Sequence, residues 1–64
     1  MKLIAARAEA GMLQREVVEE LKKRGCHISK NTLISYEKGR TKPDIDTARM
    51  LADLYGQPLE NINF

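Results

Sequence analysis

Four glycines divide this chain of 64 residues into short segments, and their spacing limits what the chain can fold into. They are Gly11, Gly25, Gly39 and Gly56, and each follows a run of residues with helical character. Glycine often ends an α-helix, because it adopts the left-handed backbone of the C-terminal cap without steric cost. No useful stretch alternates apolar and polar residues as a strand does. The sequence therefore predicts an all-α fold of five short helices.

The predicted helices span residues 2–10, 13–24 and 30–38, followed by a helix that opens at Asp44 and a last short turn at 59–61. Apolar residues recur in them at the spacing of a helix face turned to a core. The residues expected on these faces are Leu3, Ile4, Ala8, Leu13, Val17, Val18, Leu21, Leu33, Tyr36, Ile45, Ala48, Leu51, Ala52 and Tyr55.

Length and composition restrict the class of protein. We expect residues 1–64 to form one domain, which at this size buries about 60% of its unfolded surface. The single cysteine, Cys26, forms no internal disulfide and fits a reducing, cytoplasmic setting. No apolar run approaches the roughly 20 residues of a membrane helix, and Met1-Lys2-Leu3-Ile4 shows no signal peptide.

Several kinds of functional site lack their components in this sequence. Cys26 and His27 stand alone, whereas zinc needs about four ligands in spaced pairs, so we expect neither metal nor cofactor. The chain has no glycine-rich phosphate loop and no nucleophile next to a base. We therefore expect a protein that is not an enzyme.

Charge is distributed unevenly along the chain, although the net charge is only +2. Residues 30–42 carry four cations and one acid, a net of +3, whereas residues 43–64 carry one cation and four acids, a net of −3. The four cations are Lys30, Lys38, Arg40 and Lys42. A basic centre of this kind is typical of a small nucleic-acid-binding protein, and an ordinary solvated surface is the alternative.

The predicted helix 30–38 has two different sides. Ser29 caps it, and Leu33 and Tyr36 share the side expected to face the core. The opposite side carries Lys30, Asn31, Ile34 and Ser35. Such a front suits the major groove of DNA, where asparagine pairs with adenine, lysine reaches guanine and isoleucine touches thymine methyls. The flanking cations would neutralise phosphates without reading sequence.

An ordered set of short motifs runs through almost the whole chain. The set comprises Gly11-Met12-Leu13-Gln14, Val17-Val18, Leu21, Ile28-Ser29, Leu33, Glu37, Gly39, Pro43, Leu51-Ala52, Gly56 and Leu59. In order and spacing it resembles the Cro/repressor-type helix-turn-helix proteins, the lambda repressor-like or XRE family. The first motif is similar to the family's Gly-Leu-Thr-Gln opening of its second helix.

The resemblance implies roles for individual residues. Lys30, Asn31 and Ser35 match base-reading positions of the family, and Ile34 shares their helix side. The positions expected to meet phosphates are Gln14, Ser29, Lys38, Arg40 and Lys42. Arg7 and Glu37 match an ion pair that ties the first helix to the third, which makes Glu37 structural.

The chain departs from the family pattern in two places. Leu13 stands where a Thr or Ser usually caps the second helix, so that cap is expected to be missing or to come from elsewhere. Residues 22–28 also lengthen the connection before the third helix by about five residues compared with the tight turn of the family. The second helix is expected to gain a turn and to end at Gly25, which affects the angle of the third helix.

We expect a sequence-specific transcriptional regulator, a repressor, that reads double-stranded DNA with helix 30–38. A homodimer on two half-sites about one helical turn apart fits so small a domain. The alternative is a protein-interaction module, such as the antitoxin-type partner of a toxin protein, because one fold serves several functions. The cations grouped at one end of the predicted helix favour DNA.

Overall fold

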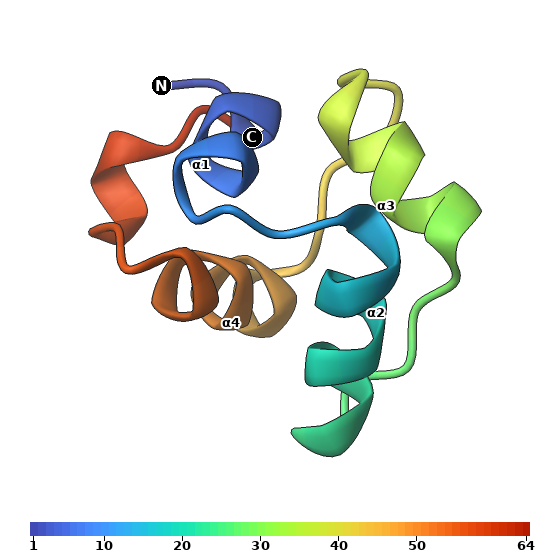
Figure 1. The fold of residues 1–64 in the computed structure, drawn as a ribbon. Helices are drawn as coiled ribbons and strands as arrows, with labels where there is room; N and C mark the ends of the chain where they lie inside the picture. The colour runs from blue at the N-terminus through green and yellow to red at the C-terminus, as the bar shows by residue number, and fades with distance from the viewer.

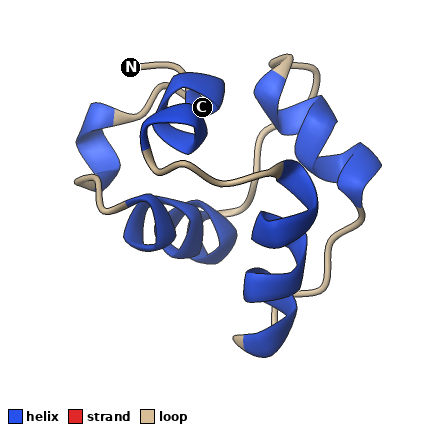
Figure 2. Ribbon diagram, viewed as in Figure 1, coloured by secondary structure: helices blue, strands red, loops and turns tan.

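The computed structural model describes all 64 residues, and its architecture is helical throughout (Figures 1 and 2). Four α-helices are followed by one turn of 3₁₀ helix: α1 Leu3–Glu9, α2 Gln14–Lys23, α3 Lys30–Glu37, α4 Ile45–Tyr55 and η1 Leu59–Asn61. Extended backbone pairs only in an isolated bridge between Lys2 and Asn63. The predicted fold class is confirmed, and the fifth predicted segment is a 3₁₀ turn, not an α-helix.

Each α-helix ends in the same C-terminal motif. The φ angles of the four glycines lie between 68° and 85°. After α3, the Gly39 N–H donates to the Tyr36 carbonyl at 3.1 Å, and the Arg40 N–H donates to the Ser35 carbonyl at 3.0 Å. This pair of bonds is the Schellman arrangement, and the other three α-helices close with the same pair. The glycine spacing therefore set the helix ends as predicted.

The core lies where the four α-helices and the C-terminal segment meet. Its nine mutually packed buried residues are Leu3, Ala6, Val17, Leu21, Leu33, Leu51, Ala52, Tyr55 and Ile62. Each α-helix contributes at least one of them, so no helix buries its apolar face without the others. None of the helices combines the length and the apolar character needed to cross a membrane.

Some residues of the predicted apolar faces lie outside this core. Ile4, Leu13 and Ile45 are 47%, 52% and 55% exposed, and Ala8 is exposed as well. Leu13 precedes α2 with extended backbone, so its side chain does not follow the helical wheel. Within α1 the buried residues are Leu3 and Ala6, which turns Ile4 and Ala8 away from the core.

The connection between α2 and α3 is held against α4. The Arg24 guanidinium lies 2.9 Å from an Asp53 carboxylate oxygen, and the Cys26 Sγ lies 3.6 Å from the Thr47 hydroxyl. Both partners belong to α4, and Cys26 also packs against the core. The part-buried Cys26–Thr47 contact thus holds the longer connection against α4, whereas the Arg24–Asp53 pair is exposed and contributes little.

Candidate nucleic-acid interface

The first turn of α3 is fixed by a side-chain cap. The Ser29 backbone is extended, and its hydroxyl oxygen accepts from the Thr32 N–H at 3.1 Å. The hydroxyls of Ser29 and Thr32 also lie 3.0 Å apart. The cap satisfies one of the backbone donors that every helix leaves unpaired at its start. Lys30 and Asn31 are the first two residues after it, so the cap fixes the backbone that carries them.

The two sides of α3 differ in exposure as the sequence indicates. Leu33 is fully buried, and Tyr36 packs against the core but keeps part of its surface. On the other side Lys30 and Asn31 are exposed, whereas Ile34 and Ser35 are half-buried. The accessible polar surface of α3 is therefore concentrated in its first turn.

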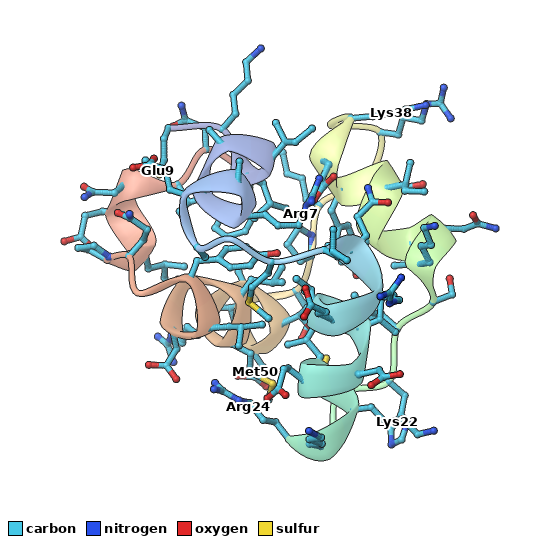
Figure 3. The ribbon with its side chains drawn as sticks, viewed as in Figure 1. Arg7, Glu9, Lys22, Arg24, Lys38 and Met50 are labelled. Carbon is cyan, nitrogen blue, oxygen red and sulfur yellow. The ribbon has the colours of Figure 1, made fainter.

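Arg7 of α1, labelled in Figure 3, forms the expected ion pair with Glu37 of α3. The Arg7 Nε lies 2.6 Å from Glu37 Oε2, and Nη2 lies 3.3 Å from Oε1, so the contact is bidentate. A third donor of the guanidinium, Nη1, bonds to the Met12 carbonyl at 3.1 Å. The Glu37 side chain is only 4% exposed. Arg7 therefore joins α1, α3 and the turn that precedes α2.

Gln14 belongs to the same cluster. Its side-chain Nε2 donates to Glu37 Oε1 at 3.0 Å, so the amide faces α3 and is half-buried. At the start of α2, Leu13 has no acceptor to cap the helix, and its N–H donates to the Glu16 carboxylate at 2.8 Å. The missing side-chain cap expected from the sequence is thus observed. The first N–H groups of α2 gain no side-chain acceptor from Leu13.

A shallow depression lies between the N-terminal ends of α2 and α3. It is lined by Arg7, Leu13, Gln14, Arg15 and Lys30. Cations and helix N-termini both favour an anion, so its chemistry fits a phosphate group. Arg15 is not among the residues that the sequence predicted to contact DNA. Its position directly after Gln14, in the first turn of α2, is the signal that would have identified it.

The other predicted phosphate-contacting residues lie at the opposite end of α3. Lys38, Arg40 and Lys42 are exposed on the turn after the helix, and Figure 3 shows Lys38 projecting from its end. None of them forms an ion pair, and neither does Lys30. Cations with unpaired charge therefore lie at both ends of α3, with Lys30 in its first turn and the other three after its last.

Comparison with known proteins agrees with this geometry. The helix-turn-helix family model matches residues 3–62. The chain is also 34% identical, over 50 residues and 78% of its length, to the cryptic phage CTXphi transcriptional repressor RstR of Vibrio cholerae. The match spans 45% of the length of that repressor. No solved structure matches the chain significantly. Because the family model covers nearly the whole chain, the protein belongs to the Cro/repressor-type helix-turn-helix family.

Proposed function

We propose that the protein is a sequence-specific transcriptional repressor that reads the major groove of double-stranded DNA with α3. The observation that carries the proposal is the division of α3. Leu33 is buried on one side, while Lys30 and Asn31 are exposed on the other, beside cations that have no ion partner. The similarity to a phage transcriptional repressor supports repression as the direction of regulation.

In this proposal Lys30 and Asn31 make the principal base contacts. They are exposed at the N-terminal end of α3, which is the part of a recognition helix that meets base edges. Asparagine pairs bidentately with adenine, and lysine reaches the O6 and N7 atoms of guanine. Ser35 and Ile34 are half-buried and add a permissive hydroxyl and a contact with thymine methyls.

Phosphate contacts position the helix on both sides of the bases it reads. At one end, Arg15 and the start of α2 at Gln14 bind a phosphate in the depression, which Lys30, the residue after Ser29, also lines. The Gln14 amide is engaged with Glu37, so Gln14 contributes its backbone N–H to this contact. At the other end, the exposed cations of the turn after α3 contact the phosphates of the second DNA strand. These cations are Lys38, Arg40 and Lys42.

A homodimer completes the proposal. One domain of this size offers a small interface, and dimers of such proteins bind half-sites roughly 34–36 Å apart, one turn of B-DNA. Two copies would place two α3 helices in successive major grooves on one face of the duplex. The operator is then a pseudo-palindrome.

Selection of bound sites from random duplexes tests the function. We expect enrichment of a motif made of two inverted half-sites with centres about 10 base pairs apart. Sedimentation of the complex is expected to give two protein chains for each duplex. Failure to enrich any motif, with no salt-dependent binding to duplex DNA, would contradict the proposal and favour a protein-interaction module.

A further inference from the structure

A second group of cations lies apart from the depression described above, at the C-terminal end of α2. Lys22, Lys23 and Arg24 are exposed there, and so is His27 in the connection to α3. Three of these residues, Lys22, Lys23 and His27, line one shallow depression together with Glu19. The group belongs to the part of the chain that is longer than in the family pattern, so the tight turn of the family has no equivalent for it.

The structure explains two of the three consecutive cations. The Arg24 guanidinium pairs with Asp53 of α4 at 2.9 Å, and the Lys23 Nζ pairs with Glu20 one turn back at 3.1 Å. Lys22 has no ion partner and makes no side-chain hydrogen bond. The charge of Arg24 is therefore paired within the protein, whereas the charge of Lys22 has no partner there.

The Lys22 side chain extends on the same side of the molecule as α3 (Figure 3). Figure 3 shows Lys22 extending on the side of the molecule where α3 and Lys38 lie, whereas Arg24 extends to the other side, near Met50 of α4. The two neighbouring cations thus face different surroundings. Lys22 shares a side with the proposed recognition helix, and Arg24 is turned toward the body of the protein.

The length of α3 determines how far apart the cations beyond its two ends lie when the helix occupies the major groove. Its eight residues make a helix about 12 Å long, similar to the width of about 12 Å of the major groove. Along the chain, Lys38 comes directly after the C-terminal end of this helix. Lys22, at the end of α2, and His27, in the connection, come before its N-terminal end. A helix of this length in the groove brings cations beyond its two ends close to the two phosphate backbones.

We infer that Lys22, with His27 beside it, binds a DNA phosphate outside the base pairs that α3 reads. The inference rests on the proposed function of α3 as the DNA-reading helix. Lys22 supplies the charge, and the imidazole of His27 supplies a hydrogen-bond donor. Glu19 lines the same depression and repels a phosphate there, so it reduces the affinity that Lys22 provides.

The salt dependence of binding tests this contact. A random-sequence duplex of about 20 base pairs, roughly two helical turns, is titrated with the protein in a series of salt concentrations. Each lost phosphate contact lowers the slope of log affinity against log salt by about 0.9. Affinity falls by some factor when the salt is raised from about 50 to 200 mM. For Lys22→Ala we therefore expect this factor to be about 3- to 4-fold smaller than for the parent.

Arg24→Ala is the matched control, because it also removes one positive charge, two residues further along the chain, from a side chain that is paired with Asp53 in a solvent-exposed contact. We expect it to keep the slope of the parent, while Glu19→Gln binds more tightly than the parent. Equal slopes for Lys22→Ala and the parent, or equal losses in the two alanine variants, would overturn the inference while leaving the function of α3 intact. A parent protein that does not bind the duplex overturns both.

Discussion

Glu37 accepts three side-chain hydrogen bonds from two other helices. It accepts from Arg7 of α1 at 2.6 Å and 3.3 Å and from Gln14 of α2 at 3.0 Å, and its side chain is almost completely buried. A buried carboxylate is stable only when its hydrogen-bonding capacity is filled by donors such as these. The cluster therefore fixes the relative positions of three helices through one side chain.

Glu37→Ala is expected to destabilise the protein by about 3 kcal/mol, because it leaves the guanidinium of Arg7 partly buried and without its partner. Chemical denaturation measures the free energy of unfolding. Glu20→Ala is the control, since it removes a glutamate from an exposed pair with Lys23 and should cost at most about 1 kcal/mol. A Glu37→Ala protein as stable as the Glu20→Ala protein would show that the cluster does not hold the helices together.

Asn31→Ala is expected to weaken binding to the selected site by about 1–3 kcal/mol and to relax the preference at one base pair of each half-site. Asn31 is exposed in the first turn of α3, so its removal leaves the core unchanged. Competition binding against the selected site and its single-base variants measures both effects. A loss that is the same for every sequence would mean that Asn31 does not read bases.

Tyr55 carries the one buried side-chain polar atom that lacks a hydrogen-bond partner, its hydroxyl. Burial, and next the charge of Glu37, raise the pKa of this hydroxyl well above its ordinary value. As the pH rises, this tyrosine therefore loses its proton first in the unfolded chain, at about pH 10. Above that pH the ionisation favours the unfolded chain, so the folded protein loses stability as the pH rises further.

Tyr55→Phe removes the unpaired hydroxyl and is expected to stabilise the protein by about 1 kcal/mol near neutral pH. The advantage of the variant should grow above about pH 10, because its side chain has no proton to lose. Denaturation curves recorded on both sides of this pH measure the difference. A less stable variant, or one whose advantage shrinks at alkaline pH, would be the opposite of what the buried hydroxyl implies.

At the scale of the elements, helix ends were more predictable than helix faces. The glycines and Ser29 act through their own backbone or through neighbours a few residues away, so the sequence displays the complete motif. The side on which Ile4 or Ile45 lies depends instead on which helices pack against its own helix from elsewhere in the chain. Local chemistry could therefore be inferred directly, and packing could be inferred only from periodicity.

For the candidate interface, too, the exposure of residues on one helix could be predicted, but contacts between helices could not. The exposure of Lys30 and Asn31 follows from the wheel of one helix, so the sequence indicated it. The bond from Gln14 to Glu37 joins residues 23 positions apart, and no local pattern signals that the amide would face inward. Arg15 differs from this bond, because its place in the first turn of α2, directly after Gln14, is visible in the sequence, and only its closeness to Lys30 depends on how α2 and α3 pack.

Gly39→Ala tests the helix ends. A Cβ atom at this position would meet no other atom within 4 Å, so any cost comes from the left-handed backbone alone, about 1–2 kcal/mol. Thermal unfolding of the synthetic 64-residue chain measures it. D-Alanine at the same position is the matched control, because it prefers positive φ and also restricts the unfolded chain, so it should be neutral or stabilising. Equal losses for both enantiomers would point to steric crowding instead.

For the whole molecule, the distribution of charge matters more than its total of +2. Four cations without an ion partner lie at the two ends of α3, namely Lys30, Lys38, Arg40 and Lys42, whereas the acids of the C-terminal third lie on or after α4 or just before it. We expect Arg40→Ala and Lys42→Ala each to lower the salt slope of DNA binding by about 0.9 without changing the selected motif. The measurement is a salt series on the selected site and on a random duplex. A changed motif would mean that these residues read bases.

The choice of bases and the position of the connection before α3 depend on different residues of this protein. The residues proposed to choose bases, Lys30 and Asn31, are exposed in the first turn of α3, while Cys26 of the connection before that helix contacts Thr47 of α4. Selection acting on the first pair can change which operator is recognised and leave the docking geometry unaltered. Selection acting on the second pair can retune the angle of approach, and with it the tolerated half-site spacing, without altering any base contact.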